Sequence, residues 1–389
     1  MTPRRAAALA ALGLVATACG SSRKPAPPAL PTSGPPGVVR IGLAHLLWPL
    51  DPAHARTRDE VVVARALFST PLRTDADGRL RPGLCTSWRP AGAGWRLRCR
   101  HAGAIARELR RAHLVPRAAA RHDTLTVSAR SPYVLTEVAA APPGVPGPFR
   151  LISASPARVV AERRGLRLDF RRLEPHAAAR LFRRGKLDEA PVPLGDLRAG
   201  LRNPTLRPAV RVRRLLALDL VYWVNGSAEL RQVYDDTADR ADYQALVPEF
   251  EAPPAETLNR PAPNARAAVL AASRARKKIG SLPKVAIRFA KPADPDLAYG
   301  ARLLVAAWRD IGLGAYFGHG RPDARFERVL APYPRDEALR DAVRGKTVIP
   351  ISWAVDARLV SQRLGGWRED PLGGVDYTRV RPRDRRPRR

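Results

Sequence analysis

The chain has 389 residues, 68 Lys and Arg against 36 Asp and Glu, and a net charge of +32. A hydrophobic content of 45% is enough to bury a sizeable core and argues against a chain that is disordered throughout. The charge invites a nucleic-acid interpretation, but 61 of the basic residues are Arg and only 7 are Lys. This imbalance is typical of codon bias in a GC-rich genome, so most of the charge is expected on a solvated surface.

The N-terminus has the pattern of an export signal. Arg4 and Arg5 precede an apolar run of thirteen residues, which is too short to span a bilayer, so residues 1–18 are expected to form a signal peptide. The small residues before Cys19 resemble a bacterial lipobox, in which the cysteine thiol is acylated. An ordinary secretory signal with a chance cysteine is the alternative. Residues 19–36 are rich in Pro and predict a tether, and hence a lipid-anchored protein on the outer face of the cytoplasmic membrane.

Next along the chain, apolar patterns predict a strand over 38–43 and a helix over 59–68. Two short runs then flank a Pro/Gly-rich turn and predict a hairpin, which brings Cys85 near Cys99. A disulfide here would stabilise the fold by about 3 kcal/mol. Two free buried thiols are the alternative, whereas two cysteines without a His cluster do not make a zinc site.

Later segments continue the alternation of the two element types. Strands are predicted over 123–127, 167–171, 218–225, 285–289 and 348–353, and helices over 175–184, 229–247, 265–279 and 297–311. Alternating strands and helices predict an α/β or mixed class.

Short segments spread along this series occur in the order and spacing of a known family. They are Ile41-Gly42-Leu43, Leu50-Asp51-Pro52, Pro82-Gly83-Leu84, Ser87-Trp88, Gly94-Trp95-Arg96-Leu97-Arg98, Gly147-Pro148-Phe149, Gly185-Lys186-Leu187-Asp188, Val221-Tyr222-Trp223-Val224-Asn225, Leu230-Arg231-Gln232-Val233, Ile311-Gly312-Leu313 and Ile349-Pro350-Ile351. With them the chain resembles the family 5 extracellular solute-binding proteins, the oligopeptide- and dipeptide-binding components of ABC importers. It is shorter than most of the family, and elements expected after Arg100 and between Ile311 and Ile349 are missing.

The resemblance implies a two-lobed α/β fold of the type II periplasmic-binding-protein class, with mixed sheets and a hinge. It places lobe I at 37–227, lobe II at 228–345, a return to lobe I at 346–378 and a basic tail at 379–389. It also implies a monomer that takes up a small polar solute such as a peptide and delivers it to the permease subunits of an ABC importer. A degenerate paralogue that kept the scaffold without transport is the runner-up.

Six residues are candidates for the ligand site, because such clefts are rich in aromatic side chains and carry a few placed polar groups. They are Trp48, Tyr222, Trp223, Trp353, Trp367 and the carboxylate Asp356. Asp356 would answer a peptide α-amine, with Asp336 as the other carboxylate in a comparable position. The alternative for each Trp is core packing, and for each carboxylate an exposed surface charge.

No catalytic or cofactor motif accompanies these candidates. The seven His are scattered without a metal-ligand or triad pattern, so no enzyme activity, metal or cofactor is expected. The strongest rival is binding of an envelope polyanion, supported by six Arg without an acid in 198–214 and by a net charge of +6 in 379–389. No nucleic-acid-binding motif is present, so a specific nucleic-acid partner is not expected.

Overall fold

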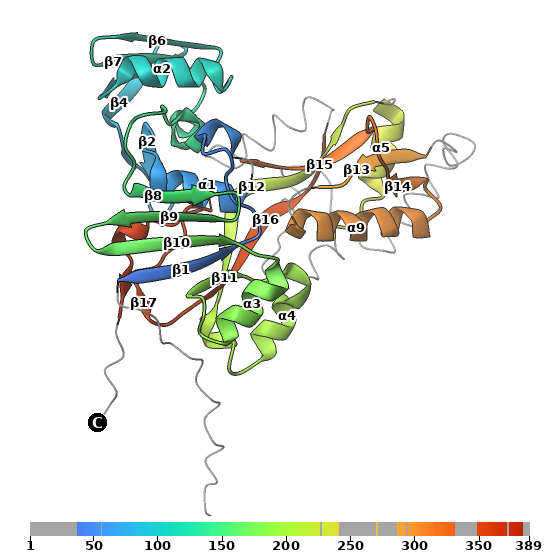
Figure 1. Ribbon diagram of the computed structural model, residues 1–389. Helices are drawn as coiled ribbons and strands as arrows, with labels where there is room; N and C mark the ends of the chain where they lie inside the picture. The colour runs from blue at the N-terminus through green and yellow to red at the C-terminus, as the bar shows by residue number, and fades with distance from the viewer. Residues whose placement is uncertain are drawn as a thin grey trace, which may run out of the picture.

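A computed structural model gives the fold of the chain (Figure 1). It describes residues 37–55, 57–225, 228–240, 270, 286–292, 295–330, 348–371 and 373–383. The predicted signal peptide, Cys19, the Pro-rich tether, nearly all of the predicted helix 265–279, Asp336 and the last six residues of the basic tail lie outside these residues. No helix in the described part is long and apolar enough to cross a membrane.

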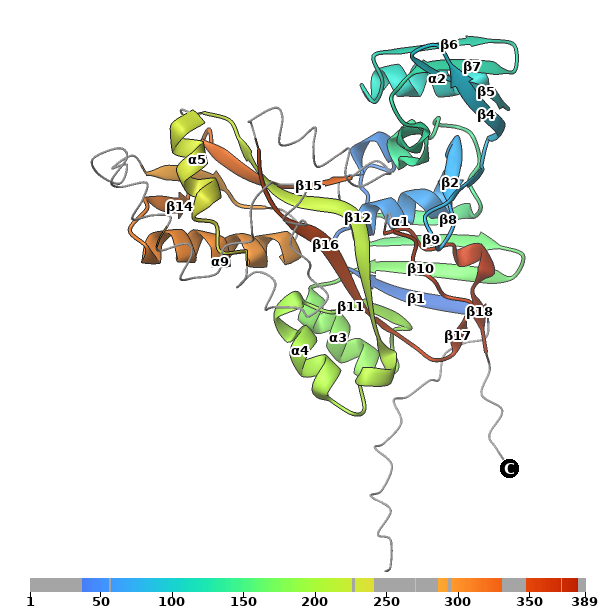
Figure 2. The ribbon, with the colours of Figure 1, turned by 180° about the vertical axis from the view of Figure 1, so that it is seen from behind.

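One mixed sheet of ten strands runs through both lobes (Figures 1 and 2). Its spatial order is β14 (Ala315–Phe317), β13 (Ile287–Ala290), β15 (Ala324–Leu330), β12 (Val210–Trp223), β16 (Val348–Val360), β11 (Glu189–Pro191), β1 (Val38–Leu43), β10 (Leu166–Arg172), β9 (Arg158–Arg163) and β8 (Arg150–Ser155). The parallel pair β1 and β10 lies at the centre of lobe I, and the parallel pair β13 and β14 lies in lobe II.

The two longest strands, β12 and β16, connect the lobes. They pair antiparallel with each other, and the register of the pair shifts between Arg214 and Leu218. On the lobe II side of this shift β12 pairs with β15, while the other end of β16 pairs with β11 of lobe I. These two strands therefore connect the lobes, and the boundaries expected from the sequence at 227/228 and 345/346, which border or lie within residues outside the described part, stay a prediction.

Helices cover both faces of the sheet. In lobe I, α1 (Arg58–Leu67) lies on one face, and α3 (Pro175–Arg183) and α4 (Leu194–Arg202) lie on the other (Figures 1 and 2). In lobe II, α5 (Ala228–Asp236) and α9 (Pro295–Asp310) pack together: the rings of Tyr234 and Trp308 are 5.2 Å apart. The core on this side continues from α3 to α9, and Tyr299 of α9 lies against Gly195 of α4.

A separate small layer follows the strands β2 (Leu72–Thr74) and β3 (Leu80–Pro82) of lobe I. It is a four-stranded sheet in the order β4 (Cys85–Ala91), β5 (Gly94–Cys99), β7 (Thr124–Ser128) and β6 (Arg117–Arg121), with α2 (Ala102–Arg111) on one face. Cys85 and Cys99 face each other across the predicted hairpin and are joined by a disulfide.

Most predicted elements are present. The strand at 38–43, the helix at 58–67 and the helix at 175–183 are confirmed to within one residue at either end. The strand expected at 348–353 continues to Val360. Its second half is buried as well, but it was not predicted because charged side chains interrupt its apolar pattern. Helix α2 was missed; of the five residues that it buries, only Ile105 and Leu109 are large apolar side chains. The predicted helix 229–247 begins as α5, which ends at Asp236, and residues 241–247 are outside the described part.

Candidate ligand-binding site between the lobes

A small polar pocket lies where the lobes meet, beside the passage of β16 between them. Its volume is ≈ 30 Å³, enough for about one or two water molecules. Residues from the loop after β1, the first turn of α1, the loops around α3 and α4, β15 and β16 line it: Ala44, His45, Thr57, Arg58, Asp59, Pro175, Pro191, Pro193, Arg328, Asp356 and Arg358. Both lobes therefore contribute polar side chains to one pocket.

The first turn of α1 delivers Arg58 and Asp59 to this place. A capping box fixes the turn: the Thr57 hydroxyl accepts from the backbone N–H of Glu60, and the Glu60 carboxylate accepts from that of Thr57. One oxygen of Asp59 accepts from the backbone N–H groups of Ala44, at 2.6 Å, and of the next residue. The helix start and the loop after β1 are thus held together by a single carboxylate.

Strand β16 adds Asp356 and Arg358, which share one face because they are two residues apart. The Arg358 guanidinium donates to Asp356 at 3.1 Å and also to Asp59. On the other side, Arg58 Nε lies 3.4 Å from Asp356. Each of the four side chains is less than 10% exposed, so the pairs act with little screening by water.

A second carboxyl group, Glu369, completes the cluster in the loop that follows β17 (Leu364–Gly365). It accepts from Arg58 Nε at 2.9 Å and is hydrogen-bonded to Asp356. Burial and the neighbouring Asp356 charge raise the pKa of Glu369 well above its usual range. Burial would also raise the pKa of Asp356, but the guanidiniums of Arg358 and Arg58 outweigh it and hold the pKa below its usual range. The two opposite shifts favour a charge on Asp356 and a proton on Glu369.

Glu189 of β11 is the deepest acid of this group, with no exposed surface. One of its oxygens accepts from Trp367 Nε1 at 2.8 Å and from the Tyr377 hydroxyl at 2.7 Å. The other oxygen lies 3.6 Å from Arg58 Nη1. Among the described residues, that oxygen, Arg58 Nη1 and Arg358 Nη1 make no hydrogen bond, so the cluster offers an acceptor and two donors to a polar group.

The structure separates the six residues predicted from the sequence. Only Asp356 lines the pocket, and Trp367 reaches the same cluster through Glu189. Trp48 lies in the loop after β1 and is 50% exposed. Tyr222, Trp223 and Trp353 do not line the pocket: Tyr222 packs under Arg325 at 4.8 Å, Trp223 packs in the core against Tyr234, and Trp353 is 3% exposed. Asp356, for which an exposed surface charge was the alternative, is buried.

Sequence reasoning missed His45, Arg58, Asp59, Arg328 and Arg358. One usable signal was a pair of charged residues two apart inside an otherwise apolar strand, as in Asp356 and Arg358. Arg58 and Asp59 at the start of α1 gave no such signal, because charged residues are common in a first helical turn. Among the described residues, no group of His, Cys, Asp and Glu is arranged to hold a metal ion.

No family model matches the sequence, and no curated protein matches it. Several solved structures are similar to this chain. OppA of Haemophilus influenzae in complex with RPPGFSPFR matches with a TM-score of 0.70 at 16% identity, over 90% of this chain and 99% of that one. The chain has the two-lobed fold of a solute-binding protein.

Two further binding proteins match over similar lengths. NikZ of Campylobacter jejuni in complex with Ni(L-His) gives a TM-score of 0.66 at 13% identity, over 89% of this chain and 100% of that one. The Escherichia coli murein tripeptide binding protein MppA gives 0.67 at 13% identity, over 87% and 96%. MppA in its unliganded open form gives only 0.56 at 14% identity, over 91% and 99%. The lobe arrangement of this chain is thus less similar to that open form.

Proposed function

We propose that this chain is a family 5 solute-binding protein, which encloses a small polar solute between its lobes and hands it to an ABC permease. The observation that carries the proposal is the interlobe pocket, to which Arg58 and Asp59 of lobe I, Arg328 of lobe II and the connecting strand β16 all contribute. Ligand groups held from both sides stabilise the closed state, which is how a hinged two-lobed protein couples binding to closure.

A peptide or amino acid is the cargo that this pocket suits best. The charged groups of the pocket are paired with one another, and Asp356 lies against the guanidiniums of Arg58 and Arg358. A solute with both an ammonium and a carboxylate group can replace one partner of each sign in these pairs. No net buried charge is then left in the pocket. A pocket of ≈ 30 Å³ admits such a solute only after the lobes part. The register shift of the β12–β16 pair between Arg214 and Leu218 is the place where we expect the hinge.

The test is a thermal-shift screen of the purified mature chain against amino acids, dipeptides and oligopeptide pools. A solute at 100 times its dissociation constant should stabilise the fold by about 2.7 kcal/mol. His45→Trp should abolish the shift by filling the pocket, whereas His122→Trp, at an exposed turn of the four-stranded sheet, should leave it intact. A shift that survives in His45→Trp would place the ligand elsewhere.

Two outcomes would favour the alternatives. No shift with any pool, together with no permease or ATPase gene near the coding gene, would favour a degenerate paralogue without a transport role. Tight binding to an anionic polymer without any small-solute response would favour an envelope polyanion-binding lipoprotein. The Arg-rich stretch 198–214, one of the two that suggested polyanion binding, runs from the end of α4 into the start of β12.

We further propose that the protein is exported and anchored through an acylated Cys19. The proposal rests on the charged N-terminus, the short apolar run and the Pro-rich tether of the sequence. Intact-mass measurement of the membrane fraction tests it. A mature chain that starts at Cys19 with the added mass of acyl groups is expected, and an unacylated start at another residue would refute the anchor.

A further inference from the structure

The four-stranded sheet β4-β5-β7-β6 has one covered and one uncovered face. Leu97, Leu125 and Val127 point to the covered face, where they form a core with Ile105 and Leu109 of α2. Figures 1 and 2 show α2 on that side, and no helix or strand of the described residues lies on the other. Because side chains alternate along a strand, the residues between these apolar positions belong to the uncovered face.

That uncovered face, called here the basic sheet face, carries five arginines and four hydroxyl groups. They are Arg89 on β4, Arg96 and Arg98 on β5, Arg117 and Arg121 on β6, with Ser87, Thr124, Thr126 and Ser128. Residues 85–130 contain ten Arg, no Lys and two acids, a net charge of +8 in 46 residues. A quarter of the total net charge of +32 thus lies in this short segment.

Internal pairing does not account for these arginines. Arg89 and Arg96 are direct cross-strand partners, and like charges in that position destabilise a sheet. In the part of the chain that the structure describes, Arg98 pairs with Asp123 at 2.8 Å, and no acceptor is found for Arg89, Arg96, Arg117 or Arg121. The arrangement therefore costs stability in the isolated protein, and an anion bound across the strands would relieve this cost.

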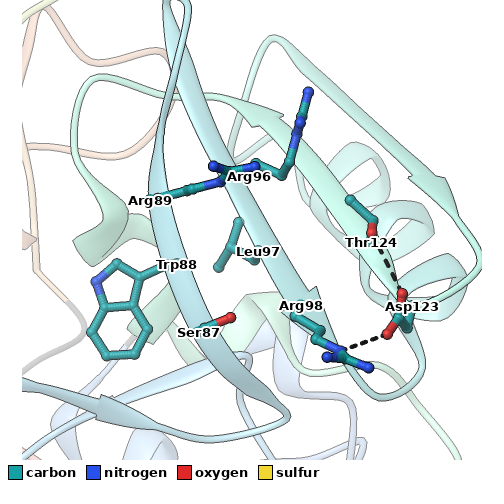
Figure 3. A pocket seen from close by; sticks show the side chains of 8 residues that line it. All are labelled: Ser87, Trp88, Arg89, Arg96, Leu97, Arg98, Asp123 and Thr124. Atoms are coloured by element: carbon teal, nitrogen blue, oxygen red, sulfur yellow. Dashed lines mark hydrogen bonds and ion pairs between the residues drawn. The ribbon is translucent and has the colours of Figure 1, made fainter.

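A recess crosses this face over β4 and β5 (Figure 3). Its volume is ≈ 390 Å³, and Ser87, Trp88, Arg89, Arg96, Leu97, Arg98, Asp123 and Thr124 line it. The side chains of Arg89 and Arg96 lie side by side at one end, and Arg98 with Asp123 and Thr124 lies at the other. From β4 to β6 the arginines extend over three strand spacings, about 14 Å, which is longer than a single phosphate group.

We propose that the basic sheet face binds a linear polymer that carries repeated phosphate groups. Guanidinium groups bind phosphate oxygens in a bidentate fashion, and the hydroxyls of Ser87 and Thr124 can donate further hydrogen bonds. A recessed row of charges fits a chain-like ligand better than the flat surface of a bilayer. This site is separate from the interlobe pocket and shares no residue with it, so the inference does not depend on the proposed function.

The experiment measures binding of fluorescently labelled inorganic polyphosphate to the full mature chain by anisotropy, over a range of salt concentrations. The test variant is Arg89→Gln/Arg96→Gln/Arg121→Gln. The matched control, Arg150→Gln/Arg172→Gln/Arg183→Gln, removes the same charge from exposed positions on β8, β10 and α3. The wild type should bind at 150 mM salt. The test variant should bind at least tenfold more weakly, and its slope of log affinity against log salt should fall by about 2, at roughly 0.7 for each lost contact.

The control should change affinity by less than about threefold, since its charges lie on β8, β10 and α3, outside the basic sheet face, and exposed charges are screened by salt. Equal losses in both variants would overturn the proposal, because they would mean that diffuse charge and not this face binds the polymer. Tighter binding of the wild type to polyglutamate or to phosphatidylglycerol vesicles than to polyphosphate would overturn it too. Arg89→Lys/Arg96→Lys/Arg121→Lys keeps the charge but not the bidentate geometry, so an intermediate affinity supports the proposal, and full wild-type affinity refutes the bidentate role.

Discussion

The proton shared by Asp356 and Glu369 makes a sharp prediction about the charge cluster between the lobes. Burial and the Asp356 charge raise the pKa of Glu369 well above its usual range, and Arg358 and Arg58 lower that of Asp356, so we expect the charge on Asp356 and the proton on Glu369. Glu369→Gln replaces one neutral hydrogen-bonding group by another, so we expect a loss of less than about 1 kcal/mol of unfolding free energy. Asp356→Asn instead removes the one charge that faces both guanidiniums. Deleting one partner of a buried ion pair costs about 3–5 kcal/mol.

The loss in Asp356→Asn should depend on pH, because Glu369 can replace the missing charge. Without its carboxylate neighbour, the pKa of Glu369 falls, and its carboxylate then faces Arg58. The replacement charge exists only above that pKa, so the variant gains stability as pH rises and loses it as pH falls. We expect a loss of about 1–3 kcal/mol at pH 8 that grows to about 3–5 kcal/mol at pH 5. In Asp356→Asn/Glu369→Gln the full loss should be present at both pH values.

Urea unfolding followed by circular dichroism, with all four proteins at pH 5 and pH 8, measures these differences when the m-values agree. A Glu369→Gln variant that loses as much stability as Asp356→Asn would show that Glu369 is ionised in the folded protein. A pH-independent loss in Asp356→Asn would show that Glu369 does not take over the charge. Either result would refute the assignment of the shared proton.

Three further predictions concern other parts of the molecule. A Cβ at Gly200 in α4 meets no close contact, so Gly200→Ala should raise the unfolding free energy by about 0.5–1 kcal/mol. A Cβ at Gly195 would lie 3.3 Å from the ring of Tyr299, so Gly195→Ala should not raise it. If this contact pushes the lobes apart, the radius of gyration of that variant should increase. Reduction of the Cys85–Cys99 disulfide should lower the unfolding free energy by about 3 kcal/mol; no change on reduction would mean that the thiols are free. Burial raises the pKa of Glu137 to about 7, so the wild type should lose about 1–3 kcal/mol between pH 4.5 and pH 7 that Glu137→Gln does not lose; parallel stability curves for the two proteins would refute this.

The local elements that could be predicted share one property: their signal lies in adjacent residues. The strand Val38–Leu43 is a β-branched run, and α1 starts at a Thr-x-x-Glu capping box before an apolar stripe. The hairpin that pairs Cys85 with Cys99 is encoded by a Pro/Gly turn between two short runs. Helix α2 was not predicted, because only two of the residues that it buries, Ile105 and Leu109, are large and apolar, and Ala and Arg make up most of the rest of the segment.

By itself the sequence determined the class of fold, several of its strands and helices and the export-like N-terminus, because periodicity, turn residues and landmark spacing are local properties. Only the tertiary structure decided which charges matter. Arg58, Asp356 and Glu369 are about 300 residues apart at the extremes and meet because β16 and its following loop return to lobe I beside α1. With 61 arginines in the chain, no local pattern tells a buried, paired guanidinium from a solvated one. The same is true of the basic sheet face: its arginines gather because antiparallel pairing places alternate residues of three strands on one side.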